Sequence, residues 1–386
     1  MVSKRWLNRL VVLVGVVLLQ SGCQRTTRLE PLWVGQLTPA ERSRESIELV
    51  RQFVEQTNAA AEPVIPGHRL QVIHAQVDAS LDTFSGQTSR LSAVNRVAMI
   101  FGGDTAMQAE KIRIGDTTEP ILLLTAAGSS GPVPPLNRFH LGIAPIERGR
   151  MIALDLRDRL KPNRALLLRD ANPHHQPIWD TLERGLLDSS IAWEVLPSDA
   201  PTTTRMARMQ AVPEQSLVVI VGDTSMLTKL REEFPKEKRG NLSVFFVGED
   251  AESASWRSQF RDFPVTLFCL SAVPVTPTTT VATQLLEAVN KQAIRSISPQ
   301  DWLHLESLKI WTDLVHQKKS SQYGVLREQL LKAEALEGVT GKLRFGKNQQ
   351  VFRAGFVIEL RSDGDQSRAT IDPPPLPPAP SSPAQK

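Results

Sequence analysis

Short apolar runs alternate with amphipathic stretches along the chain from residue 31 onward. Most of the apolar runs are continuous, and they occupy residues 32–37, 70–77, 97–101, 121–125, 165–168, 217–221, 243–247 and 265–270. Continuous runs of this length are typical of strands that are buried on both faces, as in a parallel sheet covered by helices. The pattern therefore predicts a series of parallel strands.

The segments between these runs have the spacing of amphipathic helices. In residues 38–56, Thr38 is predicted as the N-cap and Pro39 as the first helical residue, followed by an apolar stripe from Ile47 to Val54. Alternation of strands and helices predicts an α/β fold with doubly wound sheets and right-handed crossovers. The runs are too many for one compact unit, so two lobes are expected.

In the C-terminal third, the alternation of strands and helices gives way to successive helices. Ser298 as a cap and Pro299 after it give the clearest helix start in the chain. Three helices are predicted in succession, at residues 278–292, 298–317 and 321–336, and two strands follow, at 342–345 and 355–360. A polar turn separates these two strands.

The N-terminus combines a basic leader with an apolar core. Three basic residues, Lys4, Arg5 and Arg9, precede ten apolar or small residues, 10–19. Ten residues rise about 15 Å as a helix, which is roughly half of the hydrocarbon core of a bilayer. Residues 1–22 are therefore predicted to be a signal peptide rather than a transmembrane helix.

Cys23 follows two small residues, Ser21 and Gly22. This ending resembles the lipobox of bacterial lipoproteins, in which the cysteine sulfur receives a diacylglycerol and becomes the mature N-terminus. Cys23 is expected to be the lipidation site, with a plain secretory signal and a retained membrane anchor as alternatives. The other cysteine, Cys269, lies in an apolar run, so we expect a buried thiol and no disulfide framework.

Charge and motifs exclude several classes of function. The formal net charge is +4, and three of the basic residues lie in the leader; no stripe of Lys and Arg with interleaved aromatics indicates nucleic acid. The chain has no G-x-S-x-G, H-E-x-x-H or P-loop motif, so no enzyme, metal or cofactor is expected. The proline-rich tail, residues 372–386, is predicted to be polyproline-like or disordered.

The stretch "GVTGKLRFGKNQQ" and the strand after it resemble the ending of type I periplasmic binding proteins, the receptors of branched-chain amino-acid and amide ABC transporters. Those proteins have a Gly-x-x-Gly turn, a strand ending in Phe, a polar turn and a strand that returns to the other lobe. Further segments are similar to that family in the same order: "PLWVGQLTP", "RVAMIFGGDTAMQAEKI", "EPILLLTAAGSSG" and "SLVVIVGDTSMLTKL". The resemblance covers about residues 31 to 365.

This resemblance implies an α/β fold of two Rossmann-like lobes with parallel sheets and a three-strand hinge. The chain is expected to divide into a signal peptide (1–22), a lipidated linker (23–30), a first lobe (31–142 and 273–350), a second lobe (143–272 and 351–371) and a disordered tail (372–386).

The resemblance also implies a ligand cleft outside the carboxyl ends of the strands, where helix N-termini present free N–H groups. The Ser129 hydroxyl and the N–H groups of Asp104 and Thr105 are expected to hold a ligand carboxylate. The Ala127 carbonyl is expected to accept a hydrogen bond, and Asp250 to pair with an ammonium group. Each candidate has a structural alternative, as a turn residue, a helix cap or a solvated side chain. The candidate ligand-binding residues are Asp104, Thr105, Ala127 and Ser129 in the first lobe, and His174, Asp223 and Asp250 in the second.

Two functions remain in competition. The first is an exported, membrane-anchored solute-binding lipoprotein, facing the periplasm or the cell exterior, that delivers a small polar ligand to an ABC permease. The second is an interaction or sensor lipoprotein of the same fold, for example an activator of a cell-wall synthase. Asp104 would repel a ligand carboxylate, and the one tyrosine, Tyr323, lies far from the expected cleft loops; both features depart from the transport receptors.

Overall fold

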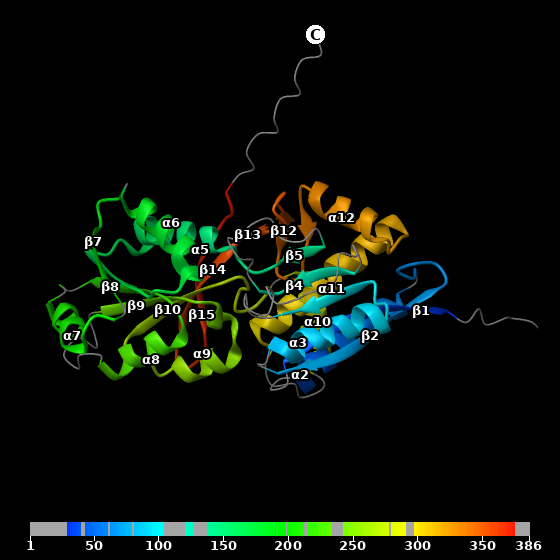
Figure 1. Ribbon diagram of the computed structural model, residues 1–386, viewed down its shortest axis with the longest axis horizontal. Helices are drawn as coiled ribbons and strands as arrows, with labels where there is room; N and C mark the ends of the chain where they lie inside the picture. Colours follow the sequence, from blue (N-terminus) through cyan, green and yellow to red (C-terminus); the bar gives the residue numbers. More distant parts are fainter. Residues whose placement is uncertain are drawn as a thin grey trace, which may run out of the picture.

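The computed structural model has two lobes that lie side by side (Figure 1). The described residues are 29–39, 43–60, 62–78, 81–103, 120–126, 137–187, 189–197, 199–211, 213, 215–233, 242–277, 279–290 and 297–374. The predicted signal peptide, Cys23 and most of the proline-rich tail lie outside them. So do Asp104, Thr105, Ala127 and Ser129.

A five-stranded sheet forms the centre of the first lobe. Its order is β2-β1-β3-β4-β5, and every neighbouring pair is parallel. Buried side chains lie on both of its faces, which explains the continuous apolar runs. The strands are β1 (Glu30–Pro39), β2 (His68–Val77), β3 (Met99–Gly102), β4 (Ile121–Leu124) and β5 (Arg138–His140).

A seven-stranded sheet forms the centre of the second lobe, in the order β15-β14-β10-β9-β8-β6-β7. The five strands from β10 to β7 are parallel, whereas β14 is antiparallel to β10 and β15 is antiparallel to β14. The strands are β6 (Arg164–Arg169), β7 (Ala192–Pro197), β8 (Ser216–Val221), β9 (Leu242–Val247), β10 (Thr266–Ser271), β14 (Gly355–Leu360) and β15 (Gln366–Ile371).

Helices flank both sheets (Figure 1). The first lobe contains α2 (Ser43–Ala59), α3 (Leu81–Ser89), α10 (Thr280–Asn290), α11 (Pro299–Lys318) and α12 (Tyr323–Lys332). The second contains α5 (Pro145–Asp155), α6 (Gln176–Leu187), α7 (Thr202–Ala211), α8 (Thr224–Glu233) and α9 (Ala254–Phe260). The predicted start of α11 is confirmed: the Asp301 N–H donates to the Ser298 hydroxyl at 3.1 Å, and the Ser298 N–H donates to the Asp301 carboxylate at 2.9 Å.

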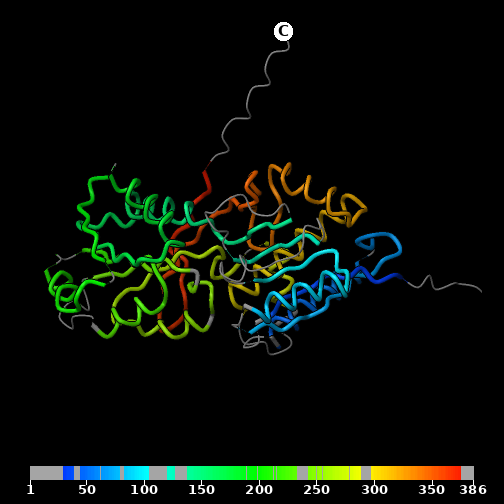
Figure 2. The backbone as a smooth tube through the Cα atoms, viewed as in Figure 1, coloured from blue at the N-terminus to red at the C-terminus, as the bar shows by residue number. Residues whose placement is uncertain are grey.

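Within the described residues, the chain crosses between the lobes three times, and these crossings together are called the hinge. They follow β5, follow β10, and lie at Ala354, between β13 and β14. Figure 2 shows the last segment, in red, lying among the green strands of the second lobe. Before the third crossing, a small antiparallel sheet is formed by β11 (Leu336–Glu337), β12 (Lys342–Phe345) and β13 (Val351–Arg353).

A buried ion pair lies at the hinge. Nη1 of Arg353 lies 2.6 Å from Oε1 of Glu306 on α11, and it also donates to the carbonyl of Leu141 in the first crossing, at 3.2 Å. The other carboxylate oxygen of Glu306 accepts hydrogen bonds from the N–H and the hydroxyl of Thr340, at 2.8 and 2.6 Å. The pair therefore connects α11 and the turn before β12 to the first and third crossings.

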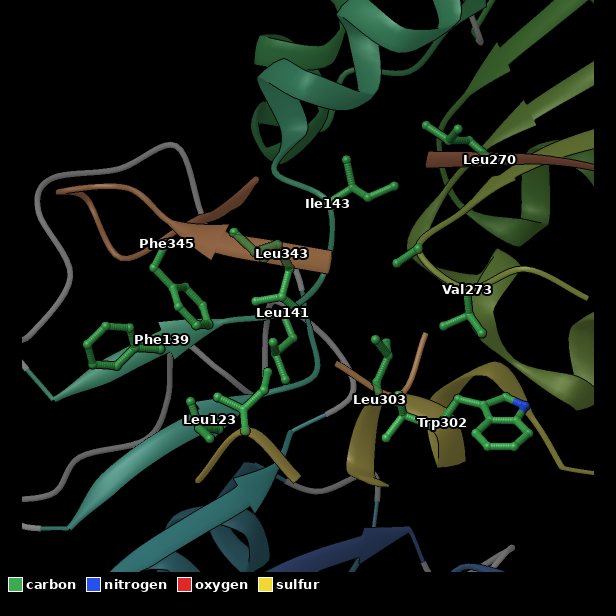
Figure 3. Close-up of a cluster of buried hydrophobic side chains, with 14 of the residues drawn as sticks. Leu123, Phe139, Leu141, Ile143, Leu270, Val273, Trp302, Leu303, Leu343 and Phe345 are labelled. Carbon is green, nitrogen blue, oxygen red and sulfur yellow. The ribbon is translucent and has the colours of Figure 1, made fainter. Parts of the chain in front are cut away.

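The hydrophobic core continues through the hinge (Figure 3). Phe139 and Phe345 meet edge to face in the first lobe, with ring centroids 5.1 Å apart. Ile143, in the first crossing, and Leu270, at the end of β10, belong to the same buried cluster, which also includes Val219 of the second sheet. One buried cluster therefore continues from one lobe into the other, while a second cluster lies within the second lobe and a third within the first.

Two details of the sequence prediction differ from the structure. Thr38 and Pro39 end β1 instead of beginning a helix, and α2 begins at Ser43. The backbone stays extended here because β1 pairs with β2 along its whole length, and Pro39 lies opposite Val77, the last residue of β2. At the third crossing, β13 still pairs with β12, so the chain changes sheets at Ala354, a few residues after the expected boundary.

Candidate ligand site

Acidic residues follow three adjacent parallel strands of the second sheet. Asp170 follows β6, Asp223 follows β8 after Gly222, and Asp250 follows β9 after a short segment. Because β6, β8 and β9 are neighbours and parallel, their carboxyl ends form one edge of the sheet. This is the edge at which ligands bind in open α/β sheets.

The Asp170 carboxylate is held by a histidine. Nδ1 of His175 lies 2.7 Å from Asp170 Oδ2, and both side chains are largely buried. The Asn172 side chain accepts a hydrogen bond from the His174 N–H at 3.0 Å, which starts the short 3₁₀ turn Pro173–His175. The turn leaves His174 exposed. His174 stays a prediction as the side chain that closes over a ligand, and the histidine in contact with Asp170 is its neighbour, His175.

Asp223 lines a pocket of about 280 Å³ between the edge strands and the helices α7 and α8. Its carboxylate accepts a hydrogen bond from the Ser225 hydroxyl at 2.5 Å. The pocket contains three acids and two basic side chains, so it is suited to a polar ligand that carries charge. Its lining residues are Leu168, Asp170, Asp199, Arg205, Asp223, Ser225, Met226, Lys229 and Leu230.

Asp250 is half-buried and lies in the 3₁₀ turn Glu249–Glu252 after β9. Its carboxylate accepts a hydrogen bond from the hydroxyl of Thr224, the first residue of α8. Thr224 directly follows Asp223, so this hydrogen bond brings the segments of both predicted acids together. His174 is not among the residues that line the pocket beside them.

In the first lobe, the described part of the expected site ends at two glycines, Gly102 at the end of β3 and Gly103 directly after it. Gly102 has φ +115°, and a Cβ there would lie 2.4 Å from the carbonyl oxygen of Leu37. Gly103 has φ +80°, and its carbonyl accepts a hydrogen bond from the Ala126 N–H at 3.0 Å. Glycine is therefore required where the chain leaves β3, immediately before Asp104 and Thr105.

The sequence prediction missed Asp170 and His175. Both lie in the segment "LRDANPHHQP", directly after a predicted strand. The rule that carboxyl ends of parallel strands line the site would have selected Asp170, and a histidine five residues later is within reach of its carboxylate. Among the residues that the structure describes, no group of three His, Cys, Asp or Glu side chains could hold a metal ion. No described helix is both long and apolar enough to cross a membrane.

No protein-family model matches the chain, and no curated protein matches it significantly. Solved structures do. A leucine-binding protein from Thermotoga maritima superposes with a TM-score of 0.71 at 11% identity, covering 89% of this chain and 99% of that one. A branched-chain amino acid transporter substrate-binding protein from Streptococcus pneumoniae, in complex with isoleucine, superposes with a TM-score of 0.65 at 14% identity, covering 88% of this chain and 99% of that one. A solute-binding protein of an ABC transporter from R. palustris, in complex with benzoate, superposes with a TM-score of 0.65 at 11% identity, covering 89% of this chain and 97% of that one.

Proposed function

Because the chain has the two-lobed α/β fold of type I periplasmic binding proteins, we propose that it is an extracytoplasmic solute-binding lipoprotein. It captures a small polar ligand, an amino acid or an amide-like compound, between the lobes and delivers it to an ABC permease. The observation that carries this proposal is the acidic edge of the second sheet, where Asp223 and Asp250 lie on segments joined by a hydrogen bond.

In this proposal the two lobes bind opposite ends of the ligand. Asp250 and Asp223 accept hydrogen bonds from a ligand ammonium group, and His174 closes over the ligand from its exposed turn. The first lobe contributes the N–H groups of Asp104 and Thr105, together with the Ala127 carbonyl and the Ser129 hydroxyl. The glycines after β3 support this assignment because they allow the backbone to turn sharply at the start of the Asp104 loop.

Calorimetry with L-leucine, L-isoleucine and benzoate tests the site. Charge-assisted hydrogen bonds contribute about 1.5–3 kcal/mol each, so Asp250→Ala should weaken binding of the two amino acids roughly 10- to 100-fold. Benzoate has no ammonium group, so its affinity should be insensitive to this change. Asp262→Ala, at an exposed acid on the same lobe, is the matched control. Amino-acid affinities that are equal in both variants would refute the role of Asp250.

Lipid attachment at Cys23 is tested separately. In a bacterial host, the wild-type protein should partition into the detergent phase of a Triton X-114 extraction, and Cys23→Ser should remain in the aqueous phase. A tether of this kind raises the effective concentration of a receptor near its permease. If the variant still partitions into detergent, the lipobox interpretation is wrong.

Binding of none of these probes, nor of other members of an amino-acid and amide library, would favour the interaction-protein function. In that case the partner is sought among cell-wall synthases.

A further inference from the structure

The segment Gly248–Glu252, called the β9 loop here, is attached to the first crossing by a buried arginine. Arg148 lies on α5 and is only 3% exposed. Its Nη1 donates to the Gly248 carbonyl at 3.1 Å, and its Nε donates to the Ile143 carbonyl at 3.1 Å. One guanidinium group therefore holds the start of the β9 loop and the first crossing at the same time.

The other end of the loop is attached to the second crossing by a buried acid. Oε1 of Glu252 accepts a hydrogen bond from the Ala272 N–H at 2.6 Å, and Oε2 accepts one from the Ser271 hydroxyl at 2.7 Å. Glu252 is 7% exposed. A third contact holds the middle of the loop, because Nε of Arg257 donates to the Ala251 carbonyl at 2.8 Å.

Asp250 lies between these two attachments. Its carboxylate contacts Thr224 at the start of α8, which is the side of the loop where the candidate ligand site lies. A rotation of either crossing therefore acts on the backbone that carries Asp250. Charged groups as deeply buried as Arg148 and Glu252 hold these contacts firmly, since a lost contact would leave a charge without compensation in the interior.

We propose that Arg148 and Glu252 are positioning residues that couple the β9 loop to two of the three hinge crossings. Displacement of the loop on one side is transmitted to the crossing on the other side, although the hydrogen bonds of Arg148 go to the first crossing and the β9 loop, and those of Glu252 go to the second crossing. The assignment of this coupling to ligand-driven closure rests on the proposed function. The coupling itself is a property of the ligand-free protein.

Hydrogen exchange of the ligand-free mature chain, measured by mass spectrometry, tests the coupling. Arg148→Met should speed exchange at residues 248–253, where the contact is direct, and also at least tenfold at the amide of Ala272, which Arg148 does not contact. Arg150→Met is the matched control on the same helix, because Arg150 pairs with Glu147 and does not contact the β9 loop. It should leave the exchange of residues 248–253 and Ala272 unchanged.

Glu252→Gln is the reciprocal variant and keeps the size of the side chain. It should speed exchange at Ala272 directly and at residues 142–148 remotely, while β4 and β7 keep their wild-type rates. Changes confined to the direct contacts of each variant would overturn the proposal, and so would uniform acceleration throughout the molecule, because that indicates global destabilisation alone. Failure of all ligands to bind would count against the proposed function and leave this measurement unaffected.

Discussion

Replacing Glu306 by Gln removes the charge that compensates Arg353 at the hinge. Glu306 is fully buried and Arg353 is 4% exposed, so the guanidinium would remain in the interior without its counter-charge. The two carboxylate oxygens of Glu306 accept from Arg353 and from both donors of Thr340. A glutamine has one acceptor oxygen, so its NH₂ group would face a donor. Breaking a buried pair in this way costs about 3–5 kcal/mol of the free energy of unfolding.

Urea denaturation followed by tryptophan fluorescence measures this loss. Trp179 in the second lobe and Trp302 and Trp311 in the first lie in one buried cluster, so their emission reports the loss of the core that passes through the hinge. The double variant Glu306→Gln with Arg353→Met removes both charges and should recover most of the lost free energy, because apolar replacement of a buried pair is often neutral. A loss below about 1 kcal/mol in the single variant, or a double variant no more stable than the single one, would refute this reasoning.

Burial lowers the pKa of His140 from 6.5 to about 4. The free energy of unfolding should therefore be highest above pH 6.5 and fall by up to about 1.4 kcal/mol per pH unit between pH 6.5 and pH 4, because only the unfolded chain binds the proton there. Urea titrations of His140→Gln should lack this part of the pH dependence, and a pH profile equal to that of the wild type would contradict the assignment. Burial raises the pKa of Cys269 to about 12, so Ellman's reagent at pH 8 should label this thiol only after unfolding; rapid labelling of the native protein would count against its burial. Gly102→Ala should cost at least about 2 kcal/mol in thermal or chemical unfolding, because of its positive φ and the clash with Leu37. Gly86→Ala in α3, where a Cβ meets no neighbour within 4 Å, should instead stabilise by about 0.5–1 kcal/mol, and equal effects of the two changes would rule out the strain argument.

Most of the strands that the continuous apolar runs predict are buried on both faces; β2, an edge strand with several half-buried residues, is an exception. β4 and β8 are examples of burial on both faces, which produces the uninterrupted apolar runs that predicted them. The strands that were missed have weaker signals: β7 and β15 are half-exposed edge strands with polar residues, and β5 has only three residues. An edge strand requires neither a continuous run nor strict alternation, so its pairing is set by the neighbouring strand.

The candidate site could be predicted only in part. Asp223 and Asp250 are predicted because each follows a strand, and their place at the carboxyl edge of the second sheet agrees with that local rule, while their role in binding stays a prediction. The partner of Asp250 is Thr224, which is distant in sequence, and the contact depends on β8 and β9 being neighbours. The contact of His175 with Asp170 could not be predicted, because it depends on the 3₁₀ turn that the Asn172 side chain starts. The four first-lobe candidates stay predictions, because they lie outside the described residues.

The antiparallel pairing of β14 with β10 limits how early the second sheet can form while the chain is synthesised. β10 has an apolar edge, and its partner β14 comes after the helices α10, α11 and α12, which belong to the other lobe. During synthesis from the N-terminus, the second sheet cannot be completed until β14 and β15, residues 355–371, are available. During that interval the edge of β10, with the sequence "TLFCLS", is exposed to other chains. Aggregation during folding should therefore depend on this strand, and holding chaperones that cover it would raise the yield of folded protein.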